Sequence, residues 1–160
     1  MSDLLFRPMS AADETAFYTM AEEFYHSDAV LHPIPAEYHR RTFAEIMRSQ
    51  MYLSGYVFQD GLEMAGFCVT NRMMQHEAGG VIVWVEDLYI RPAYQGQGLG
   101  SRFLSWLEDT LRGEAVMLRL ETEPENEGAR RLYQRLGYTD LGYLQTVSYT
   151  HLTLPTICSV

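Results

Sequence analysis

Hydrophobic residues along this chain follow two different periods. Between residues 11 and 49 they recur at helical spacing, as in Phe17, Met20 and Phe24, which predicts amphipathic helices. Between residues 52 and 90 they gather in short, partly alternating runs bounded by turn signals such as Asp60-Gly61, which predicts strands and hairpins. The sequence therefore predicts a helical segment that leads into a sheet.

Ten elements follow from these patterns and from the prolines and glycines between them. Strands are expected over Leu4–Pro8, Tyr52–Gln59, Met64–Met73, Val81–Ile90, Ala115–Leu120 and Tyr138–Gln145, and helices over Ala11–Tyr25, Ala36–Ser49, Ser101–Arg112 and Asn126–Leu136. The three strands between 52 and 90 should form an antiparallel meander. The strands at either end of 81–120 should be parallel neighbours joined by a crossover helix. The expected fold is α/β (α+β), with a mixed, mostly antiparallel sheet and one parallel pair.

The length and composition of the chain indicate one globular domain. The chain has 160 residues, of which 47% are hydrophobic and 21% charged, values that fit a single core. We find no run of about 18 apolar residues and no secretory signal, so no membrane partner is expected. Two cysteines are too few for a disulfide framework, and we expect a reducing cytoplasm.

The charge balance limits the classes of binding partner that suit this chain. The net charge is −9, and all twelve basic residues are Arg. Phosphate backbones repel so acidic a chain, so no nucleic acid is expected as a partner. A cationic or neutral small substrate is more compatible, although solubility alone is the simpler explanation of the charge.

The last residues have a separate interpretation. From Val147 to Thr156 they read Val-Ser-Tyr-Thr-His-Leu-Thr-Leu-Pro-Thr, which resembles the translation of a transposon adapter used in sequencing libraries. We therefore expect a single domain over 1–146 and a non-native tail over 147–160. The alternative is a genuine last strand, because the segment alternates and contains β-branched residues.

A glycine-rich loop precedes the helix expected at 101. It reads Gln95-Gly96-Gln97-Gly98-Leu99-Gly100. Glycines let a backbone approach a ligand closely, and the first N–H groups of a helix bind phosphates. The chain has no Lys, which excludes a P-loop. A dinucleotide fingerprint is disfavoured because five residues separate strand and glycines, although Glu121 lies at a suitable distance. A coenzyme A pyrophosphate loop and a turn without a ligand are the other two interpretations.

Three blocks together resemble the GCN5-related N-acetyltransferase (GNAT) family, and parts of the chain look like its bacterial members. The first block is Val85-Glu86-Asp87-Leu88-Tyr89-Ile90-Arg91-Pro92, and the second, 95–100, is similar to the family's Q/R-x-x-G-x-G/A motif. The third, 126–138, has Asn at its start, Tyr seven residues later and Gly-Tyr at its exit. The blocks are weak singly and specific as a set, and the element order matches from about residue 4 to 145.

The resemblance implies a GNAT-like acyl-CoA N-acyltransferase fold and transfer of acetyl from acetyl-CoA to an amine by direct attack. The backbone of 88–90 would pair with the pantetheine arm, with an N–H near Leu88 holding the thioester carbonyl, and the loop would hold the pyrophosphate. Gln95 stands where many members have Arg. The implied coenzyme-binding residues are Leu88, Tyr89, Ile90, Gln95, Gly96, Gln97, Gly98, Leu99, Gly100, Ser101 and Asn126.

Two residues are candidates for moving protons. An alkyl ammonium is mostly charged at pH 7, so a base or a water relay helps, and Glu86 is the first choice. Asp87 is second because it should point to the other face unless a bulge intervenes. The resemblance implies that Tyr133 is the acid that protonates the thiolate. The alternatives are a solvated or paired Glu86 and a Tyr133 that only packs on the sheet.

The acceptor is not identified by the sequence. We expect a small-molecule or peptide amine, no metal, and we leave a homodimer open. The family resemblance places the end of the first helix at the acceptor pocket, although solvated charges are the simpler interpretation there; the residues are Glu22, Glu23, Tyr25, His26 and His32. The alternative function is a non-catalytic acyl-CoA-binding sensor or partner module.

Overall fold

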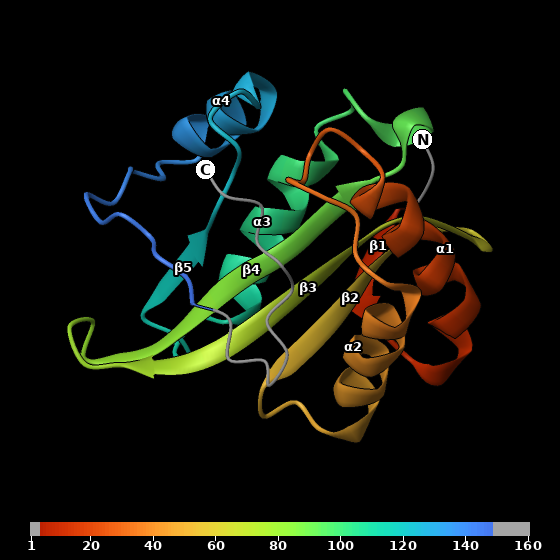
Figure 1. The fold of residues 1–160 in the computed structure, drawn as a ribbon, viewed down its shortest axis with the longest axis horizontal. Coiled ribbons are helices and arrows are strands. Elements are labelled where there is room, and N and C mark those ends of the chain that lie inside the picture. The colour runs from red at the N-terminus through yellow and green to blue at the C-terminus, as the bar shows by residue number, and fades with distance from the viewer. Residues whose placement is uncertain (1–3, 149–160) are drawn as a thin grey trace.

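A five-stranded sheet forms the centre of the molecule (Figure 1). The structure is a computed structural model, and it describes residues 4–148. The strands lie in the order β1-β2-β3-β4-β5. Their bounds are Leu5–Pro8, Leu53–Asp60, Glu63–Gln75, Gly80–Ile90 and Met117–Leu120. β1 to β4 pair antiparallel and β5 pairs with β4 in parallel, which confirms the predicted mixed sheet.

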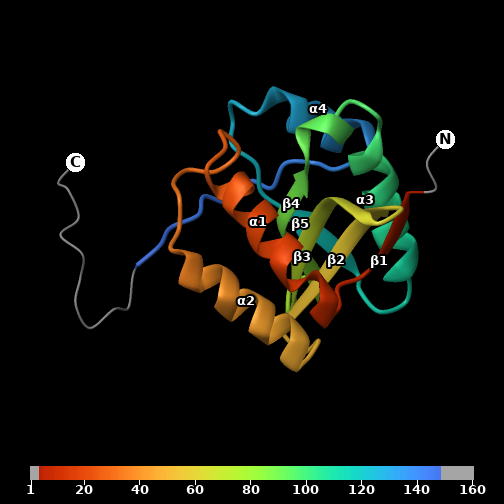
Figure 2. The same cartoon turned by 90° about the vertical axis from the view of Figure 1, so that its right-hand side faces the viewer.

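Helices cover both faces of this sheet. Figure 2 shows α1 (Glu14–Tyr25) and α2 (Ala36–Arg48) on one side and α3 (Leu99–Thr110) on the other. α4 (Glu127–Arg135) lies at the start of α3, and the 3-10 turns are Ala11–Asp13 and Pro92–Tyr94. The core is correspondingly divided. The α1–α2 core includes Phe17, Phe24, Phe43, Phe67, Val69 and Tyr89. The α3 core includes Phe58, Cys68, Val83, Val85, Phe103 and Leu104.

The start of α1 is fastened to the edge strand. The backbone N–H and the Oγ of Ser10 both donate to Asp13 Oδ2, at 2.7 and 2.9 Å, so Ser10 caps the 3-10 turn that leads into α1. Arg7 of β1 binds the same carboxylate at 2.7 Å and lowers the pKa of Asp13 to about 2. This ion pair fixes where α1 crosses the sheet.

β4 contains a bulge at Glu86. Val69 of β3 pairs with Asp87, and the next β3 residue, Thr70, pairs with Val85. Glu86 is therefore an extra residue without a partner of its own, and such a residue resets the alternation of side chains. Val85 packs in the α3 core, whereas the carboxylate of Asp87 contacts Tyr25 of α1. The bulge thus directs Asp87 toward α1.

β4 and β5 separate after a short ladder. Ile82–Val85 pair with Met117–Leu120, and β4 continues to Ile90 with β3 as its only neighbour within residues 4–148. One edge of β4 is consequently open from Glu86 onward.

The strand predicted over Tyr138–Gln145 is wrong. In the described part of the chain, the residues after α4 form no strand. Leu144 is 96% exposed, and the Tyr143 hydroxyl reaches out to Glu77 Oε1 at 3.0 Å. A strand needs a neighbour for its backbone groups, and this segment pairs with none despite its alternation. Within residues 4–148, no helix is long and apolar enough to cross a membrane.

We propose that residues 1–146 are the whole folding unit and that 147–160 is an adapter-derived tail, of which 149–160 lie outside the described residues. Val147 is 75% exposed, so a chain ending at Gln145 should melt at the temperature of the full chain. Calorimetry of both chains measures this. Codons 147–156 should also match the adapter base for base. A truncated chain that unfolds, or synonymous codons that break the match, would contradict the proposal.

Candidate active site

The glycine loop leaves its backbone uncovered. Gly96 and Gly98 both have φ of +74°, a conformation that favours glycine. A Cβ at either position would meet nothing within 4 Å. Within residues 4–148, the backbone N–H groups from Gly96 to Ser101 donate to no carbonyl. These groups surround the N-terminus of α3, where the helix dipole favours an anion. The loop can therefore hold a phosphate group through backbone alone.

The other residues of the loop hold its shape. Gln95 Nε2 donates to Ile90 O at 2.8 Å, and Gln97 Nε2 donates to Ala93 O at 3.1 Å. A Cβ on Gly100 would lie 3.0 Å from Leu132 of α4, so glycine there permits the close packing of α3 and α4. Both glutamines thus brace the loop through their side chains.

The open edge of β4 presents two backbone N–H groups. The Arg91 N–H donates to Ala65 O of β3 at 2.9 Å. Because successive amides of a strand point to opposite sides, the Tyr89 amide also faces β3, and the amides of Leu88 and Ile90 face the open edge. The Tyr89 side chain packs in the α1–α2 core, and its hydroxyl donates to Glu23 at 3.0 Å. Leu88 and Ile90 are thus available to pair with an extended ligand.

The third block supplies a cap and a buried phenol. Asn126 caps α4, with its Oδ1 accepting from the Ala129 N–H at 3.1 Å. Tyr133 packs against the α3 core, and burial raises its pKa to about 12. The Tyr133 hydroxyl therefore keeps its proton at neutral pH, as an acid or hydrogen-bond donor must.

The two adjacent carboxylates have different surroundings. Glu86 accepts a hydrogen bond from Asn71 Nδ2 of β3, while partial burial and the charge of Glu121 raise its pKa. Asp87 accepts from the Tyr25 hydroxyl at 2.9 Å, and burial raises its pKa to about 6. The predicted condition for Asp87, a bulge, is met. Sequence reasoning missed Asn71 and the Tyr25–Asp87 contact, which join residues far apart in the chain.

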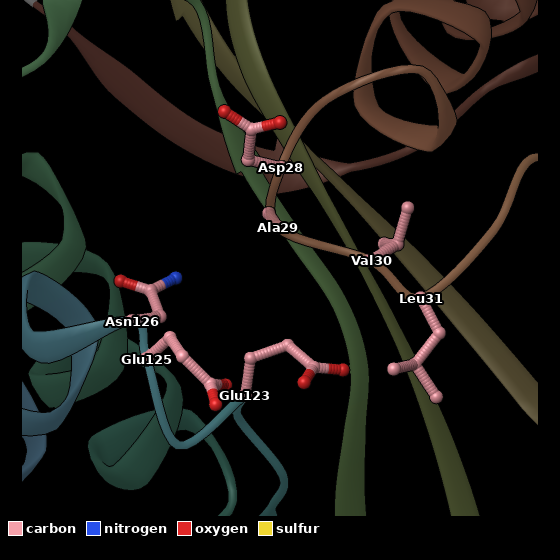
Figure 3. Close-up of a pocket in the computed structure, with 7 residues that line it drawn as sticks. All are labelled: Asp28, Ala29, Val30, Leu31, Glu123, Glu125 and Asn126. Carbon is pink, nitrogen blue, oxygen red and sulfur yellow. The ribbon is translucent and has the colours of Figure 1, made fainter.

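A cavity of about 570 Å³ lies between the loop after α1 and the segment after β5. Figure 3 shows residues 28–31 on one side and Glu123, Glu125 and Asn126 on the other. Its lining includes Asp28, Glu123 and Glu125 and no basic residue. Each wall of the cavity follows in sequence from an element that lies beside the open edge of β4. The first wall follows α1, which ends at Tyr25 beside Asp87, and the second follows β5, which ends just before Glu121.

The residues expected at the acceptor pocket lie near this cavity and do not line it. Glu22 contacts His26 and His39 at 3.4 and 3.5 Å, and Glu23 pairs with Arg91 at 3.5 Å. The ring of His32 reaches only Pro33 O, at 3.4 Å. Tyr25 does not line the cavity either, although its hydroxyl contacts Asp87. The lining comes from residues 28–31 and from the segment after β5. Of these residues, the sequence analysis indicates Asn126 alone, as a coenzyme contact.

An open strand edge next to a loop that can hold a phosphate group suits an extended, phosphate-containing ligand. The family model described as "Acetyltransferase (GNAT) family" matches residues 15–138. The chain belongs to this family, and it is an acyltransferase of the N-acetyltransferase type, as predicted. The acyl donor of the family is acetyl-CoA.

Sequence relatives agree with this assignment, and a solved structure shares the fold. The chain is 31% identical to [ribosomal protein bS18]-alanine N-acetyltransferase of Escherichia coli (strain K12) over 117 residues, which is 72% of each chain. It is 38% identical to thialysine N-epsilon-acetyltransferase of Bos taurus over 60 residues, 37% of this chain and 35% of the relative. Its fold resembles that of aminoglycoside N-acetyltransferase AAC(6')-Iy in complex with CoA, with a TM-score of 0.77, 15% identity and coverage of 94% and 97%.

Gly98→Glu should abolish coenzyme binding, because the side chain and its charge would lie against the uncovered amides. Saturating acetyl-CoA should raise the melting temperature of the wild-type protein by mass action and leave that of the variant unchanged. The matched control is Gly79→Glu, at a turn glycine with φ of +69° and equally open space, which should keep the shift. A normal shift in Gly98→Glu would show that the loop does not bind the coenzyme.

Proposed function

We propose that this protein transfers the acetyl group of acetyl-CoA to a positively charged amine by direct attack, with Glu86 as a base and Tyr133 as the acid. The observation that carries the proposal is two groups of backbone N–H donors that are unpaired within residues 4–148. Those of Leu88 and Ile90 lie at the open edge of β4, and those of Gly96–Ser101 lie at the start of α3. A long ligand with a pyrophosphate matches the two groups in shape and charge.

The residues present fit the coenzyme. The amides of Leu88 and Ile90 would pair with the pantetheine arm, and the Leu88 N–H would hold the thioester carbonyl as an oxyanion-hole donor does. The N–H groups of Gly96–Ser101 would hold the pyrophosphate. The Asn126 Oδ1 is used by its own helix, so we assign the coenzyme contact to the Nδ2 of that side chain.

Glu86 and Tyr133 would handle protons on the acceptor and leaving-group sides. A free thiol has a pKa of about 8.5, whereas that of Tyr133 is raised to about 12. Complete proton transfer to a free thiolate is therefore uphill. A hydrogen bond from the neutral Tyr133 hydroxyl stabilises the departing sulfur before the bond to carbon is fully broken. Glu86 takes a proton that the attacking nitrogen must lose.

Uncompensated negative charge at the cavity supports a cationic acceptor. Within residues 4–148, Asp28, Glu123 and Glu125 form no salt bridge, and neither do Glu86 and Glu121. A bound cation would relieve their mutual repulsion. The relatives are named for alanine of ribosomal protein bS18 and for thialysine. We propose a small-molecule or peptide amine for this chain, and a cytoplasmic location where acetyl-CoA is available.

A panel of amines with acetyl-CoA tests the function by release of the CoA thiol. The panel contains thialysine, an alanine-terminated peptide, 1,4-diaminobutane and its matched monocation butylamine. We expect 1,4-diaminobutane to exceed butylamine in kcat/KM by at least about tenfold, with the difference shrinking at high salt. Equal values would contradict the cationic acceptor. Acetyl-CoA binding without turnover of any amine would instead indicate a non-catalytic module.

Tyr133→Phe keeps the packing in the α3 core and removes only the hydroxyl. We expect kcat to fall by roughly 10²-fold with the best amine of the panel, and acetyl-CoA affinity to stay nearly unchanged. Stopped-flow turnover and calorimetric titration measure the two quantities. A variant with wild-type kcat under conditions where chemistry limits the rate would reduce Tyr133 to a packing residue.

A further inference from the structure

Acetylation of a primary ammonium removes two protons from its nitrogen, because –NH3⁺ becomes –NH– in the product. The bulge at Glu86 leaves two carboxylates, Glu86 and Asp87, in adjacent positions directly before Leu88. We propose that Asp87, positioned by the Tyr25 hydroxyl, accepts the first proton from the ammonium and that Glu86 accepts the second. This inference rests on the proposed function.

The geometry around Asp87 suits a proton acceptor. Tyr25 donates to Oδ1 at 2.9 Å, and the other oxygen, Oδ2, accepts no hydrogen bond from the described residues. One oxygen is therefore held in place while the second is free to take a proton. Tyr25 is the last residue of α1, and Asp28 and its neighbours directly after it line the cavity. The same short segment thus positions the base and borders the acceptor.

Charged and titratable groups around Asp87 come from several elements. Glu86 lies beside it on β4, and its charge raises the pKa of Asp87, while the hydrogen bond from Tyr25 opposes this. Cys68 of β3 is close enough for the Asp87 charge to act on its thiol. His39 of α2 packs on the Tyr25 ring, with centroids 5.4 Å apart. With a pKa of about 6, Asp87 is mostly ionised at neutral pH and is a stronger base than an ordinary Asp.

The proton balance closes. The Asp87 carboxylate takes one proton from R–NH3⁺ and becomes a carboxylic acid, which leaves R–NH2. The N–C bond forms as the C–S bond breaks, and the neutral Tyr133 hydroxyl donates a hydrogen bond to the departing sulfur. Glu86 takes the second proton from nitrogen. One of the two protons held by the carboxylates reaches the sulfur through solvent to give the thiol, and the other is released.

The test is the pH dependence of kcat/KM in Tyr25→Phe. Tyr25 lowers the pKa of Asp87, so its removal should move the acid limb of the profile to higher pH, while activity well above the limb recovers. Glu86→Gln should move the limb the opposite way, because it removes a negative charge. The matched control, Tyr18→Phe, removes a hydroxyl of the same helix that donates to Glu14 at 2.8 Å and should leave the profile unchanged. The probe is whichever panel amine the wild-type protein acetylates fastest.

A purely structural role for Tyr25 would lower the rate by one factor at every pH, and that result would overturn the proposal. Asp87→Asn should lower kcat by roughly 10²-fold with unchanged acetyl-CoA affinity; a wild-type kcat would also overturn the proposal.

If no panel amine reacts in the wild type, the proposed function is what has failed. Carbon-13 NMR of the protein with labelled Asp then tests whether Tyr25 controls the titration of Asp87. A carboxyl titrating near pH 6, and higher in Tyr25→Phe, supports it; an ordinary midpoint near 4 overturns it.

Discussion

The site depends on the early separation of two parallel strands. The β4–β5 ladder ends at Val85 and Leu120, yet β4 continues for five further residues against β3. Backbone groups that would otherwise join a neighbouring strand are left facing an open edge. Because an unpaired backbone amide favours a partner, this edge is suited to an extended polar ligand. The glycine loop begins soon after β4 ends, and its N–H groups from Gly96 to Ser101, unpaired within the described residues, add a second set of donors at the start of α3.

The bulge at Glu86 determines which way the carboxylates next to this edge point. With regular alternation, Glu86 and Asp87 would face opposite sides of the sheet. The extra residue brings Asp87 to Tyr25. The acidic residues that line the cavity add negative charge beyond these two carboxylates, which favours a cation. Burial and the charge of Glu121 raise the pKa of Glu86. One irregularity in β4 therefore brings this strand into contact with α1, whose following loop lines the cavity.

Sequence analysis predicted what is encoded locally. The strand–helix–strand unit was recognisable because Val81–Ile90 is strongly apolar and the glycines between 96 and 100 precede an amphipathic helix. The strand over Tyr138–Gln145 was wrong because alternation cannot show whether a neighbouring strand exists. The Tyr25–Asp87 hydrogen bond spans 62 residues, and the cavity lining comes from two distant loops. Such contacts depend on the packing of α1 on the sheet, for which the sequence carries no local signal.

Amide hydrogen exchange at β4, followed by NMR with and without CoA, tests the central claim most directly. Leu88 and Ile90 should exchange fast in the free protein and become protected when CoA is bound. Tyr89, whose amide already faces β3, serves as the internal control and should change only by the overall stabilisation. If CoA binds and the exchange of Leu88 and Ile90 stays fast, the open edge of β4 does not hold the coenzyme and the account of the site is wrong.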